Sequence, residues 1–185
     1  KLDALQDRDI LVLAGSIPPS LPKTFYSDLT KKYSKHGVKV VVDASGHVLA
    51  EVLQDKPFLV KPNHHELSEL FGVSINTVEE VIPFGKKVVE MGAENVIVSM
   101  AGAGALLFTN GKVYSATVPK GKVLNSVGAG DSLVAGFIGT YSKDQDFMKA
   151  FQIAVATGSA TAFSQDLATK EKIDSLLNQV TVKEI

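Results

Sequence analysis

The chain has 185 residues, of which 45% are hydrophobic and 21% are charged, a composition that suits one globular domain. Its 19 basic and 20 acidic residues give a net charge of −1, and no basic tail or stripe indicates binding to nucleic acid or to an anionic membrane. Because the chain has no cysteine, disulfides and thiolate metal sites are excluded. We therefore expect a soluble, cytoplasmic protein with a single domain over residues 1–185.

Short apolar runs alternate along the chain with segments of helical periodicity. Strands are expected at the runs 9–14, 38–42, 58–60, 95–99 and 113–118. Helices are expected over 25–33, 48–53, 66–71, 78–91, 132–141 and 144–163. This alternation predicts an α/β fold, with a mainly parallel sheet of buried strands and helices on both of its faces. Ligands of such sheets gather at the carboxyl ends of the strands, where Gly15, Asp43 and Lys61 fall.

The segment from Lys61 to Glu66, Lys-Pro-Asn-His-His-Glu, joins the end of a strand to the start of a helix. Asn63 can accept hydrogen bonds from the first N–H groups of the helix, and Glu66, three residues later, can complete a capping box. No metal-ligand spacing accompanies His64 and His65, and adjacent residues of a helix point in different directions. We interpret the two histidines as exposed helix residues.

Two further segments are rich in small residues. Ala101-Gly-Ala-Gly-Ala105 predicts a turn between two strands, and Asn110-Gly111 predicts a tight hairpin shortly after it. Alanines and a glycine crowd the helix expected over 144–163, which predicts close packing against the helix before it. Neither segment needs a ligand to explain it.

The stretch from Asn125 to Asp131, Asn-Ser-Val-Gly-Ala-Gly-Asp, precedes an apolar helix. Gly128 and Gly130 permit unusual backbone conformations and the close approach of a ligand. The helix behind them directs its free N–H groups and the positive end of its dipole at this loop, which makes an anion site. Because Asp131 would lie beside the bound anion, the pattern suggests phosphoryl transfer to a hydroxyl group.

A structural interpretation of the same stretch stays open. An acidic residue in a first helical turn is favourable for dipole reasons alone, and a Gly-Ala-Gly turn lets a helix pack closely on a sheet. Two other phosphate motifs are excluded. A dinucleotide fingerprint would need glycine at position 133, which is Leu133, and the Gly-Lys-Ser/Thr loop of nucleoside triphosphatases does not occur.

The run Asn125 to Ser132, Asn-Ser-Val-Gly-Ala-Gly-Asp-Ser, resembles the signature of the ribokinase-like sugar kinases. It is most similar to the 1-phosphofructokinase branch and next to the tagatose-6-phosphate kinases. The resemblance implies a ribokinase-like α/β fold, in which the backbone of Gly128, Ala129 and Gly130 forms the anion hole and Asp131 is the catalytic base. Family members carry a substantial portion before the position of Lys1, so we expect the C-terminal nucleotide-binding and catalytic portion of a kinase, without the N-terminal part and lid.

Roles outside the signature also follow from the resemblance. Lys61, Asn63 and Glu66 match a segment that lies near the nucleotide phosphates and their magnesium ion. Glu66 and Asn63 would orient the water shell of the metal, so that Glu66 binds it only indirectly. Lys61 would contact a phosphate group, and it is a weaker candidate than Asn63 and Glu66.

Two more segments are implicated in nucleotide binding by resemblance. Ser99, Gly102 and Gly104 match a segment that runs along the nucleotide, although an alanine takes the first glycine position here. Val155 and Ser159 stand where the adenine ring would lie. Members that bind a monovalent cation have an aspartate at the position of Asn125, which puts a potassium site in doubt here.

The implied reaction is the ATP- and Mg²⁺-dependent phosphorylation of a ketose phosphate, with conversion of fructose 1-phosphate to fructose 1,6-bisphosphate as first choice. Tagatose 6-phosphate or another sugar is the nearer alternative, and a non-catalytic nucleotide or sugar-phosphate binding module is the farther one. The expected partners are small molecules, not nucleic acid or membrane, and a homo-oligomer is left open. Because the acceptor pocket would lie largely upstream, residues 1–185 alone are expected to be inactive.

Overall fold

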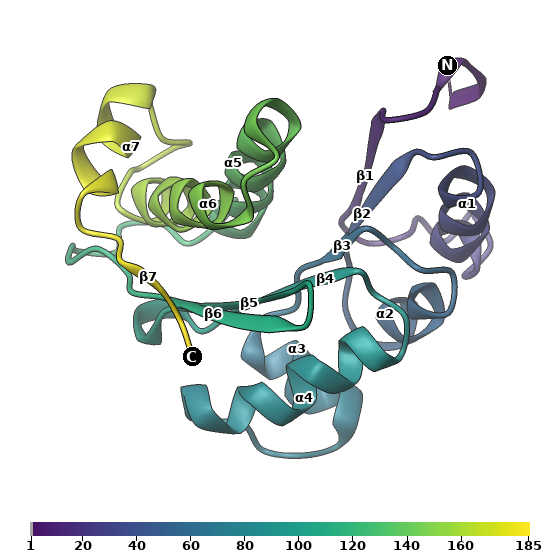
Figure 1. Ribbon diagram of the computed structural model, residues 1–185, viewed down its shortest axis with the longest axis horizontal. Helices are drawn as coiled ribbons and strands as arrows, with labels where there is room; N and C mark the ends of the chain where they lie inside the picture. Colours follow the sequence, from purple (N-terminus) through teal and green to yellow (C-terminus); the bar gives the residue numbers. More distant parts are fainter. Residues whose placement is uncertain (1) are drawn as a thin grey trace. The chain divides into compact units, whose positions relative to one another are not determined.

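The computed structural model describes residues 2–185, which fall into two compact units (Figure 1). The first unit runs to Ser99 and includes Phe108–Gly111; the second comprises Met100–Leu107 and Lys112–Ile185. Within the described residues, the strands of the first unit are hydrogen-bonded in the order β1-β2-β3-β4, which is also their order in the sequence. Among the described residues, the helices are too short or too polar to cross a bilayer. The single-domain organisation of residues 1–185 stays a prediction.

The first unit alternates strands and helices as the sequence predicts. After the short 3-10 helix η1 (Leu2–Ala4), its elements are β1 (Ile10–Ala14), α1 (Phe25–Ser34), β2 (Lys39–Asp43), α2 (Gly46–Leu53), β3 (Leu59–Val60), α3 (His64–Phe71), α4 (Val78–Glu90) and β4 (Asn95–Ser99). Neighbouring strands are parallel, with Leu13 opposite Val42 and Val60 opposite Val96. Helices α1 to α4 lie along one side of these strands (Figure 1).

The strand register brings the carboxyl ends of the first unit's strands to one edge. Ala14 pairs with Asp43, and an isolated parallel bridge joins Asn63 to Ser99. The sequence placed Gly15, Asp43 and Lys61 at strand ends, and the structure confirms it. Polar side chains at this edge come from segments far apart in the sequence, as parallel pairing through helical crossovers requires.

Central strands of the first unit are buried on both faces, as their β-branched runs predict, but β1 is not. Val40, Val41 and Val42 are completely buried, whereas Val12 in the middle of β1 is 40% exposed. The prediction of a buried strand over 9–14 is therefore wrong in its burial and right in its position. Within residues 2–185, β1 is the end strand and pairs only with β2, so fewer neighbouring side chains cover it.

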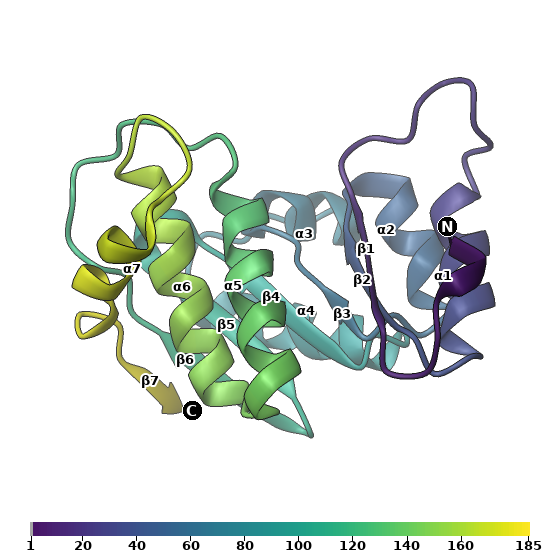
Figure 2. The same ribbon diagram turned by 90° about the horizontal axis from the view of Figure 1, so that it is seen from above.

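The second unit combines a mainly antiparallel set of strands with three helices. Its elements are the 3-10 helix η2 (Ala101–Ala103), β5 (Ala105–Thr109, whose last two residues belong to the first unit), β6 (Lys112–Ala116), α5 (Ala129–Asp144), α6 (Phe147–Ala162), α7 (Lys170–Leu177) and β7 (Val182–Glu184). Strands β6 and β7 are antiparallel, and Asn110 (φ 50°) and Gly111 (φ 75°) make the predicted tight hairpin between β5 and β6. Helices α5 and α6 lie side by side (Figure 2).

The boundary between α5 and α6 differs from the prediction. The sequence predicts one helix over 132–141 and the next from residue 144, but α5 continues to Asp144. The chain then reverses at Gln145, which has a left-handed backbone with φ of 52°. Asp146 caps α6, because its carboxylate accepts a hydrogen bond from the Lys149 backbone N–H at 3.0 Å. An aspartate cap outweighs helical periodicity here.

Candidate active site

The Gly-Ala-Gly-Asp stretch in the second unit forms the start of helix α5. Gly128 is its N-terminal cap, with a left-handed backbone (φ 76°, ψ −2°) and no side chain to satisfy the helix donors. The Ala129 N–H donates to the Ser126 carbonyl at 3.3 Å. Within residues 2–185, no acceptor is found for the backbone N–H groups of Gly130 and Asp131. These two donors, at the positive end of a 16-residue helix, are available to an anion.

Asp131 lies in the same first turn, with its side chain exposed. In the part of the chain that the structure describes, its carboxylate makes no hydrogen bond or ion pair. A carboxylate that is not engaged elsewhere can accept the proton of a hydroxyl group placed next to it. The first turn of α5 therefore offers both an anion site and a base.

Asn125 holds the loop that precedes this turn. Its side-chain Oδ1 accepts a hydrogen bond from the Val127 N–H at 3.0 Å, and its Nδ2 donates to the Gln165 carbonyl at 3.2 Å. The backbone N–H of Asn125 donates to the carbonyl of Ala162, at the end of α6. Because a carboxylate cannot donate to Gln165, the amide at this position has a structural use that an aspartate would not meet.

The segment before β5 contains one glycine that the backbone requires and one that it does not. Gly104 has φ of 110°, and a β-carbon there would lie 2.4 Å from the Ala116 carbonyl oxygen. A β-carbon on Gly102 would meet nothing within 4 Å. Ala101 is held in the left-handed region at φ of 47°, a backbone conformation that glycine adopts more easily.

Two residues of α6 were predicted to contact adenine. Val155 is 2% exposed and therefore packed inside the second unit, whereas Ser159 is half-buried. The crowding of small residues along α6 is confirmed as close packing, since Ala150, Ala154, Ala156 and Ala160 are fully buried. Of the two predicted contacts, Ser159 has the accessible side chain.

In the first unit, Asn63, Glu66 and Ser99 come together around the start of α3. Asn63 Oδ1 accepts hydrogen bonds from the N–H groups of His65 and Glu66, both at 2.9 Å, and Glu66 Oε2 accepts from the Asn63 N–H at 2.8 Å. The predicted capping box is thus confirmed. The Ser99 N–H donates to the Pro62 carbonyl at 3.2 Å, which holds β4 beside this turn.

Lys61 is buried and pairs with Asp43. Its Nζ lies 3.3 Å from Asp43 Oδ1, and the two side chains are 7% and 17% exposed. The hydroxyl of Tyr26 nearby donates to the carbonyls of Ala14 and Gly15 at 2.8 and 3.2 Å. Burial raises the pKa of the Tyr26 phenol, and the negative charge of Asp43 adds to the effect. The sequence placed Asp43 at a strand end but carried no sign that it is the partner of Lys61.

Comparison with known sequences shows the family of this chain. The sequence profile of the pfkB family carbohydrate kinases matches residues 1–173. The chain belongs to the pfkB family. A 1-phosphofructokinase from Bacillus subtilis strain 168 is 56% identical to it over 182 residues, and a tagatose-6-phosphate kinase from Staphylococcus epidermidis is 32% identical over 189 residues.

A solved structure agrees with the family assignment. The tetrameric inhibited form of phosphofructokinase-2 from Escherichia coli superposes with a TM-score of 0.88 at 28% identity, over 96% of this chain and 58% of that one. The two related sequences are covered over 60% and 61% of their length, and this chain is covered over 98% and 100%. The pfkB chain thus spans about three fifths of the length of the relatives that it matches, and its ribokinase-like α/β fold is confirmed.

Metal-binding groups in the pfkB chain are sparse. Among residues 2–185, no three His, Asp or Glu side chains lie close enough together to hold a metal ion. Glu66 uses Oε2 in the capping box, and its other carboxylate oxygen makes no hydrogen bond within the described residues. His65 is exposed as predicted, but His64 is half-buried and its Nδ1 is enclosed without a partner among those residues, so the prediction for His64 is wrong.

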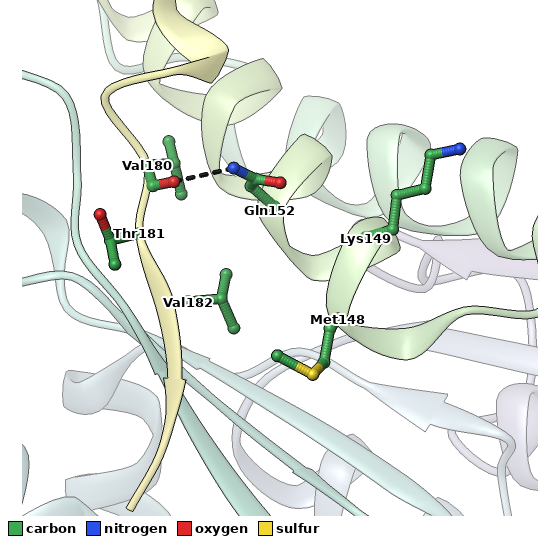
Figure 3. Close-up of a pocket in the computed structure, with 6 residues that line it drawn as sticks. All are labelled: Met148, Lys149, Gln152, Val180, Thr181 and Val182. Carbon is green, nitrogen blue, oxygen red and sulfur yellow. Dashed lines mark hydrogen bonds between the residues drawn. The ribbon is translucent and has the colours of Figure 1, made fainter.

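The second unit of the pfkB chain has a hollow of about 440 Å³ (Figure 3). Its lining comes from the start of α6 and the segment that leads into β7: Met148, Lys149, Gln152, Val180, Thr181 and Val182. Gln152 Nε2 donates to the Val180 carbonyl at 2.9 Å and ties the two walls together. None of the residues that the sequence implicates in catalysis lines this hollow.

Proposed function

We propose that the protein carrying this chain transfers the γ-phosphoryl group of ATP to a ketose phosphate, with fructose 1-phosphate as the acceptor and fructose 1,6-bisphosphate as the product. One observation carries the proposal. Two backbone N–H groups without an acceptor among the described residues and an unpaired carboxylate lie in one helical turn, at Gly130 and Asp131. The 56% identity to a 1-phosphofructokinase supports the choice of acceptor.

In the proposed reaction the acceptor hydroxyl oxygen forms a bond to the γ-phosphorus while the bond from that phosphorus to the ADP oxygen breaks. Asp131 takes the hydroxyl proton. The N–H groups of Gly130 and Asp131 donate hydrogen bonds to the oxygens of the transferred group, where negative charge is spread in the transition state. One such donor is typically worth about 2.7–4 kcal/mol and one positioned base about 10²–10⁴-fold in rate.

ATP and Mg²⁺ are the expected cosubstrate and metal of this proposal. Mg²⁺, when bound, neutralises charge on the phosphate oxygens and usually keeps several waters. The carboxylate oxygen of Glu66 that the capping box does not use can hold one of these waters, and Asn63 can orient another. Lys61, Ser99, Gly102, Gly104 and Ser159 are the remaining proposed nucleotide contacts. Lys61 has a competing partner in Asp43.

Substrate, assembly and location follow from the same proposal. The 32% identity to a tagatose-6-phosphate kinase makes tagatose 6-phosphate the second candidate acceptor. A related phosphofructokinase-2 forms a tetramer in its inhibited form, which supports a homo-oligomer here. Because ATP and sugar phosphates are metabolites of the cytoplasm, the proposed reaction places the protein there.

The test is single-turnover phosphoryl transfer by the complete polypeptide, with fructose 1-phosphate and tagatose 6-phosphate offered in parallel. Asp131→Asn keeps the size and place of the side chain but removes the base, so kcat is expected to fall by about 10²–10⁴-fold with little change in ATP affinity. Asp28→Asn is the matched control, because Asp28 is also an exposed acidic residue in a first helical turn.

Three results bear on the proposal. If Asp131→Asn lowers only the melting temperature, by the equivalent of about 0.3–1 kcal/mol, Asp131 is a helix-dipole residue and not a base. Nucleotide binding without transfer to any ketose phosphate would instead identify a binding module. Faster transfer to tagatose 6-phosphate would retain the reaction and change the substrate.

A further inference from the structure

The hydroxyl of Thr161, near the end of α6, makes contacts that set it apart within the second unit. Its side chain is buried, with 2% exposed. Thr161 Oγ1 lies 2.9 Å from the Ser132 hydroxyl oxygen and 3.3 Å from the Ala168 backbone nitrogen. Since the Ala168 N–H can only donate, Thr161 accepts that bond and has its own proton left for Ser132.

Other hydroxyls on α6, or just after its end, behave differently. Thr157 Oγ1 donates to the Ile153 carbonyl at 2.7 Å, and Ser164 Oγ donates to the Ala160 carbonyl at 2.8 Å. These bonds to the carbonyl four residues earlier are the common pattern for a threonine or serine in a helix. Thr161 departs from it, because its hydroxyl reaches out of α6 to α5 on one side and to the chain that follows α6 on the other.

Both contacts of Thr161 end beside the turn that holds the proposed base. Ser132 directly follows Asp131 in the first turn of α5, so a hydrogen bond on its hydroxyl limits the rotation of that turn. Ala168 lies next to Leu167, whose side chain packs at Gly128. A β-carbon on Gly128 would lie 3.2 Å from Leu167 Cδ2. One buried hydroxyl thereby connects the two segments that flank the loop of the anion site.

We propose that Thr161 is a positioning residue for phosphoryl transfer. It holds Ser132 and Ala168 so that the Asp131 carboxylate and the N–H groups of Gly130 and Asp131 keep one orientation. The inference rests on the proposed function, and it adds a residue to which neither the motif nor the family resemblance assigned a role. A displacement of about 1 Å at a reacting group can cost about 10²-fold in rate, so a bond that fixes one helical turn has a measurable effect on turnover.

The experiment compares Thr161→Val with Thr157→Val in the complete polypeptide. Valine has nearly the shape of threonine and lacks its hydroxyl, and Thr157 is a control on the same helix that bonds only to its own helix. We expect Thr161→Val to lower kcat by about 10–100-fold with a much smaller change in the KM for ATP, and Thr157→Val to leave both near their original values. Thr161→Ser keeps the hydroxyl and is expected to restore most of the lost turnover.

A second variant tests the same bond from its other end. Ser132→Ala is expected to reproduce the loss of kcat, and Thr161→Val with Ser132→Ala is expected to lose no more than the larger of the two single changes, because both remove one bond. Ser132→Ala also tests the bond if the Thr161→Val variant does not fold.

Several outcomes overturn the inference. If the unmodified protein transfers phosphate and Thr161→Val matches Thr157→Val in kcat, the positioning role is wrong while the proposed function stands. The same holds if Thr161→Ser restores nothing, or if the two single losses add in full. If the unmodified protein transfers phosphate to no ketose phosphate, the proposed function fails, and the role of Thr161 fails with it.

Discussion

Gly158 in α6 lies directly against the backbone of Ala129, the first residue of α5. A β-carbon on Gly158 would lie 3.0 Å from the Ala129 carbonyl oxygen and 3.2 Å from the Leu133 β-carbon. Two helices can approach this closely only where one of them has no side chain. This contact packs α6 against the first turn of α5, which carries Asp131.

Gly158→Ala is therefore expected to destabilise the protein by about 1–3 kcal/mol, since a core that is already filled has to move. Gly139→Ala is the matched control, because Gly139 is an exposed residue of α5 with nothing within 4 Å of its β-carbon position. That change is expected to stabilise by about 0.5–1 kcal/mol, from helix propensity alone. Urea unfolding of both variants measures the contrast, and equal shifts in the same direction would contradict it.

Ala101 holds a left-handed backbone, φ 47°, that glycine adopts more easily. An L-residue other than glycine pays roughly 1–2 kcal/mol there, so Ala101→Gly is expected to raise stability by about 0.5–1 kcal/mol after the extra chain entropy of glycine is counted. The control is Ala103→Gly in the same 3-10 helix, whose φ is not positive and which is expected to lose stability. Thermal melts decide it: a lower melting temperature for Ala101→Gly would be inconsistent with the strain.

The ion pair of Lys61 and Asp43 lies mostly inside the first unit. Lys61→Met keeps the bulk of the side chain and takes the ammonium group away from Asp43, with an expected loss of about 3 kcal/mol. Asp43→Asn added to Lys61→Met is expected to recover part of that loss, because it removes the buried negative charge along with the ammonium group. A double-mutant cycle on unfolding free energies measures the coupling, and strict additivity of the two changes would show that the pair contributes nothing.

Tyr26 gives the first unit a dependence on alkaline pH. Burial, and then the charge of Asp43, raise the pKa of this phenol in the folded chain. Its contribution to stability is therefore fully present below the unfolded pKa of about 10 and is lost as the pH rises through the folded pKa. Tyr26→Phe has no phenol to ionise, so its unfolding free energy is expected to fall less steeply above about pH 10 than that of the unmodified chain. Parallel slopes for the two proteins would rule out this contribution.

Features that depend on neighbours in sequence were predicted correctly. The capping box of Asn63 and Glu66 and the hairpin at Asn110-Gly111 both involve residues at most four positions apart. Hydrogen bonds of this range depend on residue type and spacing, so they can be predicted from the sequence. The same holds for the alternation of strands and helices, which periodicity alone indicates.

The sequence by itself determined the fold class, the order of most elements and the small-residue turn that precedes Asp131. Only the tertiary structure decided that Val12 is exposed, that Lys61 pairs with Asp43 and that Thr161 bonds to Ser132. Ser132 and Thr161 are 29 residues apart, and neither position has a pattern of spacing that indicates the other. The physical reason is that burial and long-range pairing depend on which surfaces pack together in space, whereas periodicity and capping depend on the geometry of a single helix or strand.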